Sequence, residues 1–426
     1  MRDKTAILVP IYNEDKHLVK INLMAIYSNV SDSSVMYVLD DSTNGSSDYL
    51  KDMCKKLGIT YIHREDRTGY KAGALNNVLR TLVDVAYVAV IDIDQMPSPD
   101  FIRETTEILY KHPKAAFVQV PQVYWNTDAN PLAEMAQAQQ FIFYDILTEG
   151  KSIDGTLFSC GTNVVYRLEA LKSVGYFDES NIVEDIATSV KMFSKGWDGI
   201  YYNKKLVFGR APTTMKGYLN QQTRWMMGSL ALAPGIFKLI LTSKSFNFSQ
   251  KLDWFASSSW YFFGFAYLVF LLAPFLDIIG IKVITINTTL YILAWMPYTV
   301  LNLTAFIYSQ LNKKAPWHYV FYNMAANAVI FPTSIISAIS VLFKKKKPFI
   351  TARTGDKLPL YHFWPQLIII VILSISVGFL LYRHTIFDDV TAFWALFQIM
   401  LLSPIFILNK TPKITDIDEP AFKIFN

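Results

Sequence analysis

Long stretches without a charged side chain occupy the second half of the chain and constrain its fold more than any other feature. Four stretches contain no Asp, Glu, Lys or Arg, namely 283–311, 315–343, 358–382 and 390–409. A fifth, 254–279, contains one charged residue, Asp277. Each stretch reaches or exceeds the ~20 residues that a helix needs to cross the hydrocarbon core of a bilayer. The pattern predicts a helical membrane region and excludes a wholly water-soluble fold.

The charged residues gather in the first part of the chain. Of all 426 residues only 18% are charged and 52% are hydrophobic, whereas soluble domains have roughly 25% charged residues. Residues 1–251 carry charge at ordinary density, so we expect a soluble domain at 1–235 and a membrane domain at 236–426. The net charge of +5 is mild, and we expect no nucleic-acid partner.

The cysteines and the first residues indicate where the soluble domain resides. Cys54 and Cys160 both lie in it and give no disulfide framework, which fits a reducing cytosol. The chain starts MRDKTAILVPIYNE, whose apolar run has the length of a strand, and we expect no signal peptide. Insertion into the cell membrane is therefore expected to depend on the later segments.

The distribution of basic residues predicts four crossings, because Lys and Arg favour the cytoplasmic side of a membrane. With the soluble domain in the cytosol, Lys313 and Lys314 lie inside after two crossings, and Arg383 lies outside after a third. The transmembrane helices are expected near 254–279, 284–310, 364–382 and 390–408. The catalytic domain of this multi-pass protein would then face the cytosol.

The segment 316–343 is interpreted as a helix lying at the cytosolic interface. If it crossed the membrane, the four lysines at 344–347 would lie outside. It also carries polar residues such as Asn323 and Asn327 among its apolar ones. The alternative is five crossings with an external C-terminus.

In the soluble half, buried strands alternate with amphipathic helices. The expected strands are 5–11, 35–39, 59–62 and 87–93, and the expected helices are 16–29, 47–57 and 71–83. Such alternation implies an α/β fold with a parallel sheet and helices on both faces. Ligands of these sheets bind beyond the carboxyl ends of the strands.

Pairs of aspartates stand at two of those strand ends. Asp40 and Asp41 close the second strand, and Asp92 and Asp94 close the fourth. An isolated pair such as Asp40 and Asp41 is equally typical of a turn or a helix cap. Asp92 and Asp94 share a face of the strand end, and two carboxylates there repel each other unless a cation or donor lies between them. Mg²⁺ or Mn²⁺ that bridges substrate phosphates would satisfy both.

Several motifs occur in an order that resembles a known family. They are VPIYNE, VLDDS, RTGYKAGALN, IDIDQM, FSCGTN, VEDIATS and QQTRW. The chain resembles the membrane-bound, inverting family 2 glycosyltransferases, and in particular the processive branch that includes cellulose, chitin and hyaluronan synthases. The resemblance covers roughly residues 5–230 closely and the membrane half in layout. It departs from the pattern in having VED for TED, DDS for DDG, and no spans before the catalytic domain.

This resemblance implies a GT-A domain, which is a Rossmann-like fold that binds nucleotide sugars, followed by a helical transmembrane domain. It implies a nucleotide-sugar donor and assigns roles to residues of the motifs. Asp92 and Asp94 would hold the diphosphate and the metal, and Asp185 matches the family's catalytic base. The nucleoside would be held by Tyr12, Glu14, Asp40 or Asp41, and Lys71.

The chemistry itself requires a group such as Asp185. An acceptor hydroxyl must lose its proton as it attacks the anomeric carbon, and a nearby carboxylate can take that proton. Glu184 is placed beside it, at the acceptor and diphosphate. The alternative is that Glu184 and Asp185 only stabilise the start of the helix that follows them.

The motif QQTRW carries groups suited to the leaving group and the acceptor. Arg224 can bind a departing diphosphate with two donors, Trp225 offers a flat face to an acceptor sugar, and Gln221 would orient one of these groups. Arg and Trp are also common anchors at a membrane interface, which is the alternative reading.

The loop 348–355 resembles the gating loop of cellulose synthases. Thr351 and Arg353 match that pattern in type, although a phenylalanine is displaced by one position and Arg replaces Lys. These two residues would close over the nucleotide. A basic cytosolic loop that touches anionic lipid is an equal alternative.

The sequence thus predicts a membrane-integrated, inverting β-glycosyltransferase. Its donor would be a nucleotide sugar, UDP-linked, that carries a hexose or N-acetylhexosamine, and its acceptor would be a growing polysaccharide or a glycolipid. One alternative is a single addition to a polyprenyl phosphate or glycolipid. Another is a membrane scaffold without activity, against which the complete set of acidic residues argues.

Overall fold

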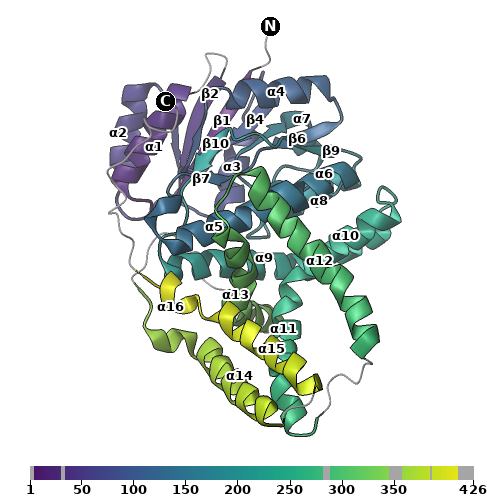
Figure 1. Cartoon of the computed structure of the whole chain (residues 1–426). Coiled ribbons are helices and arrows are strands. Elements are labelled where there is room, and N and C mark those ends of the chain that lie inside the picture. Colours follow the sequence, from purple (N-terminus) through teal and green to yellow (C-terminus); the bar gives the residue numbers. More distant parts are fainter. Residues whose placement is uncertain (1–3, 30–33, 282–287, 345–356, 384–385, 411–426) are drawn as a thin grey trace.

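The computed structural model describes residues 4–29, 34–281, 288–344, 357–383 and 386–410. Figure 1 shows an α/β domain, drawn in purple and blue, that carries the N-terminus. Long helices, drawn in green and yellow, extend from one side of it. The expected architecture, a GT-A-like α/β domain followed by a helical region, is confirmed.

The N-terminal strands and helices alternate as expected. They are β1 (Thr5–Ile11), α1 (Lys16–Asn29), β2 (Ser34–Asp40), α2 (Ser47–Leu57), β3 (Thr60–His63), α3 (Tyr70–Leu79) and β4 (Tyr87–Val90). These four strands pair in parallel, in the order β3-β2-β1-β4. Their carboxyl ends therefore meet at one edge of the sheet.

The expected parallel pairing is confirmed for these four strands, and the sheet becomes mixed beyond them. The sheet continues through β8 (Val164–Arg167), β6 (Ala115–Gln119) and β9 (Asp198–Tyr201), and β8 runs antiparallel to both β4 and β6. The direction of a strand depends on the edge from which its connection enters, which the alternation of the first 93 residues does not reveal. Because Val90 pairs with Val164, the start of β8 lies at the carboxyl edge of β4.

The hydrophobic core lies on both faces of this sheet. Ile7 and Val9 of β1 face a cluster formed with α1, α2 and α4 (Phe101–Lys111). Ala6 and Leu8 face the opposite cluster, formed with α3, α7 (Leu168–Ser173) and α8 (Glu184–Ser194). Side chains along β1 point alternately to the two faces because a strand has a two-residue period. Both faces of the sheet are therefore covered, and its carboxyl edge is left for ligands.

A second, three-stranded sheet and further helices lie at that edge. The strands are β5 (Gln95–Pro97), β10 (Val207–Gly209) and β7 (Val123–Tyr124), in that order. The helical segments are η1 (Thr127–Ala129), α5 (Pro131–Ile142), the π-helical η2 (Phe143–Thr148) and α6 (Glu149–Asp154). They connect β7 to the loop that precedes β8.

Helices make up the rest of the described chain. They are α9 (Met215–Thr242), α10 (Phe248–Ser259), η3 (Trp260–Phe262), α11 (Phe263–Ile278), α12 (Thr288–Asn312), α13 (His318–Leu342), η4 (Leu360–Phe363), α14 (Trp364–Arg383), α15 (Ile386–Leu402) and α16 (Ile405–Leu408). Six helical segments of the described chain are long and apolar enough to cross a membrane. One of them, α9, is additional to the five that the sequence indicated, and the expected domain boundary at residue 235 falls inside it.

Two ion pairs show which ends of these helices lie together. Arg383 at the end of α14 binds Asp277 near the end of α11, with 2.6 Å between Nη2 and Oδ2. Lys313, just after α12, binds Asp145 of η2 in the α/β domain, with 2.9 Å between Nζ and Oδ1. The C-terminal end of α12 therefore lies against the α/β domain, and the ends of α11 and α14 lie together. The number of membrane crossings stays a prediction.

Helix α13 packs between the α/β domain and the other long helices. Tyr319 and Tyr322 lie in a cluster with residues of α5 and α9, whereas Ala325 and Phe331 lie in one with residues of α11, α14 and α15. Ser334 donates a hydrogen bond to the backbone carbonyl of Tyr261 in η3. The placement of α13 at the cytosolic interface stays a prediction.

Candidate active site

Lys71 connects three segments at the carboxyl edge of the sheet. It belongs to the first turn of α3, and its Nζ donates to Asp92 Oδ1 at 2.6 Å and to the carbonyl oxygen of Gly161 at 2.9 Å. Burial opposes the positive charge, but attraction to Asp92, Glu184 and Asp185 outweighs burial and raises the pKa of Lys71. The ammonium group therefore stays protonated and holds the end of β4 to the loop before β8.

Gly161 brings Asp185 into this group. Its φ is +73°, and a Cβ at this position would lie 2.9 Å from Oδ2 of Asp185. A side chain here would be strained by its backbone and would also collide with the carboxylate. The backbone N–H of Ile186 donates to the other oxygen, Oδ1, at 2.8 Å. The motifs at Asp92, Gly161 and Asp185 thus converge on one place.

The electrostatics of Glu184 and Asp185 suit proton transfer. Burial, and then repulsion by Asp185, raises the pKa of Glu184 to about 7. Burial also raises the pKa of Asp185, while the N–H of Ile186 and the charges of Lys71 and Arg224 oppose that rise. A carboxylate with a raised pKa is a stronger base than one in water, and it lies near the cation Lys71.

The loop before β8 is held by residues that the sequence analysis did not single out. Thr162 Oγ1 accepts the backbone N–H of Asp92 at 2.9 Å. The buried Gln119, at the end of β6, accepts the N–H of Cys160 at 2.8 Å and donates to the carbonyl oxygens of Val120, Thr162 and Asn163. The only signal available was the motif FSCGTN, because a buried glutamine at a strand end has no pattern of its own.

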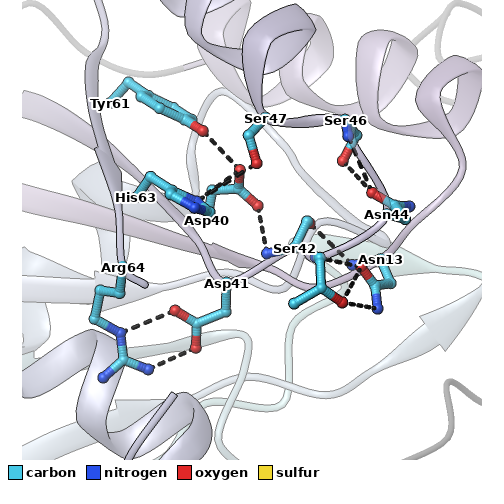
Figure 2. Close-up of polar contacts among 11 residues, drawn as sticks. Asn13, Asp40, Asp41, Ser42, Asn44, Ser46, Ser47, Tyr61, His63 and Arg64 are labelled. Atoms are coloured by element: carbon cyan, nitrogen blue, oxygen red, sulfur yellow. Dashed lines mark hydrogen bonds and ion pairs between the residues drawn. The ribbon is translucent and has the colours of Figure 1, made fainter. Parts of the chain in front are cut away.

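Asp40 and Asp41 are both bound within the protein (Figure 2). Asp40 is fully buried; its Oδ1 accepts the N–H of Ser42 at 2.8 Å and its Oδ2 accepts the hydroxyl of Tyr61 at 2.6 Å. Asp41 makes two parallel bonds to Arg64, at 2.9 and 2.6 Å. The structure therefore gives both carboxylates a role in fixing loops, and a contact of either with a nucleoside stays a prediction.

The loop after β1 is joined to the loop after β2. Asn13, whose φ is +52°, accepts the N–H of Thr43 at 2.8 Å through Oδ1, and its own N–H donates to Ser42 Oγ at 3.0 Å. Next to it, the guanidinium of Arg67 lies over the ring of Tyr12 at 3.4 Å. Glu14 is partly exposed on the same loop. The expected nucleoside residues thus share the carboxyl edge with Lys71.

Helix α9 carries the QQTRW residues toward Asp185. The positive charge of Arg224 opposes the rise in the pKa of Asp185 that burial causes. Gln221 lies within hydrogen-bonding reach of the Tyr124 hydroxyl, which also accepts from Gln140 Nε2 at 3.2 Å. Trp225 is partly exposed. One turn further along, Gly228 leaves room for Val183, because a Cβ there would lie 2.6 Å from Val183 Cγ1.

The residues expected to bind a metal supply two carboxylates. Lys71 takes one oxygen of Asp92, and Gln95 Nε2 donates to Asp94 Oδ1 at 3.1 Å. Within the described residues, no cluster of three or more His, Cys, Asp or Glu side chains could hold a metal ion. Two carboxylates fit Mg²⁺ or Mn²⁺ whose remaining ligands are substrate phosphates and water, and they do not fit a site built by protein alone. Thr351 and Arg353 lie outside the described residues.

The chain is similar to known proteins in sequence and in structure. A family model described as "Glycosyl transferase family group 2" matches residues 87–342, which is more than half of the chain. A cellulose synthase catalytic subunit (UDP-forming) of Pseudomonas fluorescens is 25% identical over 421 residues, which cover 93% of this chain and 55% of that protein. A probable glucomannan 4-beta-mannosyltransferase of Oryza sativa is 32% identical over 254 residues, covering 57% of this chain and 46% of that protein.

Among solved structures, a mannosyltransferase from Pyrobaculum calidifontis in complex with GDP-Man and Mn²⁺ is similar with a TM-score of 0.57. It is 19% identical, and the match covers 81% of this chain and 89% of that one. This likeness establishes the fold alone. The chain spans about half the length of the relatives that it matches in sequence.

Proposed function

The chain belongs to glycosyl transferase family group 2, and from this premise we propose that it is a membrane-integrated, inverting β-glycosyltransferase. It transfers a hexose or N-acetylhexosamine from a UDP-linked sugar to a growing polysaccharide or glycolipid. The observation that carries the proposal is the convergence of Lys71, Asp92 and Asp185 at the carboxyl edge of the sheet. The relatives support the substrate classes, since one is named a UDP-forming cellulose synthase and another a mannosyltransferase.

In this proposal Asp185 is the base. It takes the proton of the acceptor hydroxyl as that oxygen attacks the anomeric carbon, and the bond from that carbon to the diphosphate breaks with inversion. Arg224 lies near Asp185 and compensates the charge that grows on the leaving diphosphate. Lys71 holds Asp92 in place beside the same point. The loop fixed by Gln119 and Thr162 keeps these groups in register.

Asp92 and Asp94 would hold Mg²⁺ or Mn²⁺ against the donor phosphates, and the cation when bound supplies positive charge to the diphosphate. A structural neighbour solved with GDP-Man and Mn²⁺ supports such use of a divalent ion. The membrane half is proposed as an anchor of four crossings, with the catalytic domain on the cytosolic side. The long apolar helical segments that follow α9 support membrane integration.

The test is nucleotide release by the detergent-solubilised protein with a panel of nucleotide sugars. We expect one donor to release its nucleotide in the presence of Mg²⁺ or Mn²⁺, and EDTA to abolish the release. Asp185→Asn should reduce the rate by about 10²-fold or more, because general-base catalysis contributes ~10²–10⁴-fold. Release of nucleotide by Asp185→Asn at the wild-type rate would show that Asp185 is not the base.

The products of the same reactions show whether addition is repeated. We expect products that carry several sugars per acceptor, measured by mass spectrometry under excess donor. A single sugar on every acceptor would show that the enzyme is not processive and acts once on a lipid-linked acceptor. Activity in the presence of EDTA would show that the reaction needs no divalent metal. The fold and the family would be unaffected by that result.

A further inference from the structure

We propose that α10 (Phe248–Ser259) lies along the membrane surface, in the headgroup boundary of the leaflet next to the α/β domain, and is not the beginning of a crossing. This rests on the proposed membrane integration of the chain. By length and composition alone, α10, η3 and α11 read as one apolar span, Phe248–Ile278. The contacts of α10 separate it from that span.

The polar side of α10 faces the α/β domain. Asp253 binds Lys151 of α6, with 2.5 Å between Oδ2 and Nζ, and Ser257 Oγ accepts from the same Nζ at 2.6 Å. Gln250 Nε2 donates to the carbonyl oxygen of Asp154 at 2.9 Å. Trp254 is 1% exposed, and its ring lies 6.2 Å from that of Phe158. The polar side chains of α10, which would normally face water, thus bind groups of the α/β domain.

The apolar side of α10 faces outward. Phe248, Leu252 and Phe255 are 76%, 53% and 54% exposed. Their spacing of four and three residues places them on one face of the helix. The neighbouring end of α9 extends this surface with Leu241, which is 74% exposed, and with Phe237, whose ring stacks on Phe255 at 5.0 Å. A helix on the surface of a soluble domain packs its apolar face on the protein and turns its polar face to water. Helix α10 does the opposite.

The surroundings of this face favour lipid as its partner. Lys244 is exposed in the turn before α10 and Lys251 is half-buried on the helix, so cations border the apolar side chains as anionic headgroups require. The face is also continuous with α11. Figure 1 shows the chain turning sharply between α10, which points to one side, and α11, which runs downward.

The turn falls where a membrane interface is expected. It is made by η3, whose Trp260 and Phe262 are 56% and 45% exposed, and aromatic residues of this kind gather at headgroup level. From there η3 and α11 span 260–278, which at ~1.5 Å per residue is roughly 28 Å and close to the ~30 Å core of a bilayer. The crossing therefore needs no residue of α10.

This placement connects the bilayer to the active site. Trp254 packs on Phe158, and Phe158 directly precedes Ser159, whose N–H is bound by Ser189 four residues after Asp185. A helix fixed at the lipid surface thereby sets the depth of the catalytic loop. The acceptor would be glycosylated close to the plane of the headgroups.

Depth-dependent quenching tests the proposal on the full-length protein in liposomes. Leu252→Cys and Phe255→Cys would each carry a bimane fluorophore, with lipids spin-labelled at the headgroup, at the fifth acyl carbon or at the twelfth. Two further sites serve as references: Tyr110→Cys in α4, a residue 74% exposed in the α/β domain, and Ile375→Cys in the middle of α14, a residue 64% exposed. The parent chain, with Cys54 and Cys160, gives the background.

We expect bimane at 252 and 255 to lose fluorescence with the headgroup and fifth-carbon labels and to keep it with the twelfth-carbon label. Bimane at 375 should lose most with the twelfth-carbon label, and bimane at 110 should lose none. If 252 and 255 behave like 375, α10 belongs to the crossing and the proposal fails. If they behave like 110 while 375 is quenched, lipid is not the partner, and disulfide-linked dimers of Phe255→Cys would identify a second copy in its place.

The reference site at 375 separates this proposal from the membrane integration on which it rests. Quenching at 255 without quenching at 375 would support surface contact by α10 and refute the crossings. No quenching at either site would refute both. Nucleotide release by each labelled variant, compared with the parent chain, confirms that the labelled protein is folded.

Discussion

At the scale of single residues, Lys71 determines the electrostatics of the candidate site. Its ammonium group is buried, pairs with Asp92 at 2.6 Å and attracts Glu184 and Asp185. Because a positive neighbour favours the ionised form of a carboxyl group, Lys71 lowers the pKa of both acids against the rise caused by burial. The base is therefore kept ionised at a lower pH than its burial alone would allow.

Replacement of Lys71 should shift the pH dependence of catalysis. Lys71→Met removes the positive charge and raises the pKa of Asp185, so the pH below which kcat/KM falls should move upward. The profile of kcat/KM is the measurement, because it reports the free enzyme. Lys71→Arg keeps the charge and should keep the acid limb near that of the wild type. An unchanged limb in Lys71→Met would show that the base does not respond to this cation.

The residues that we propose take part in the chemistry were indicated by motifs in the sequence, and the residues that hold them in place were not. Asp92, Asp185 and Arg224 stand in motifs whose residue types match a reaction. Gln119 and Thr162 bind backbone groups only, and such contacts depend on the direction of β8, which the local sequence does not specify. The family resemblance implied that Asp40 or Asp41 holds the nucleoside, whereas the burial of Asp40 against Tyr61 depends on a neighbouring strand.

At the scale of secondary-structure elements, the close approach of α9 to α8 positions the site. Gly228 makes this approach possible, since a Cβ would lie 2.6 and 3.2 Å from the two methyl groups of Val183. Val183 directly precedes Glu184, and Arg224 lies one turn before Gly228 on α9. The packing therefore fixes the distance between Asp185, the proposed base, and Arg224, which we propose binds the diphosphate.

Gly228→Ala should separate these two helices. We expect a loss of about 1–3 kcal/mol in the free energy of unfolding from overpacking, and a fall in kcat of up to about 10²-fold from misplacement of the reacting groups. Gly235→Ala is the matched control, because it lies on the same helix and its Cβ would meet nothing within 4 Å. Adding Val183→Ala should restore part of the activity of Gly228→Ala. Equal effects of both glycine replacements would mean that helix approach does not matter.

The elements of the first 90 residues could be predicted from local patterns. The continuous apolar runs of β1 and β4 and the apolar stripe of α2 are local properties. The direction of β8 and the extent of α9 are not local. Helix α9 is apolar enough for a membrane, yet its second half, at Leu232 and Ile236, is buried in the core of the α/β domain. Composition cannot distinguish lipid from a protein core.

At the scale of the whole molecule, one buried ion pair joins the α/β domain to the helix that returns to it. Lys313 follows α12 and Asp145 lies in η2, and their side chains are 12% and 1% exposed. Asn203 donates to the same carboxylate oxygen at 3.1 Å. Because a buried charge without its partner keeps the full cost of desolvation, this pair couples the positions of the two parts.

Removing one partner should therefore cost more than removing both. Lys313→Met should destabilise the protein by about 3–5 kcal/mol, seen as a lower midpoint of unfolding in detergent, and Asp145→Asn combined with Lys313→Met should recover much of that loss. Lys111→Met is the control, since its pair with Glu107 on α4 is largely exposed and contributes at most about 0.5 kcal/mol. If the double variant were as unstable as the single one, the pair would not act as a unit.

The burial of Trp254 in the core of the α/β domain has a consequence for biosynthesis. The sheet and its helices are complete only when Ile236, Ile240, Phe246 and Trp254 have joined the same cluster. Under the proposed membrane integration, the apolar residues of α11 follow Trp254 out of the ribosome, so the α/β domain completes its core as the first crossing is inserted. A fragment that ends at residue 235 would expose an unfilled core, and one that ends after Trp254 would expose the apolar face of α10. Neither cut therefore yields an α/β domain that has both a filled core and a polar surface.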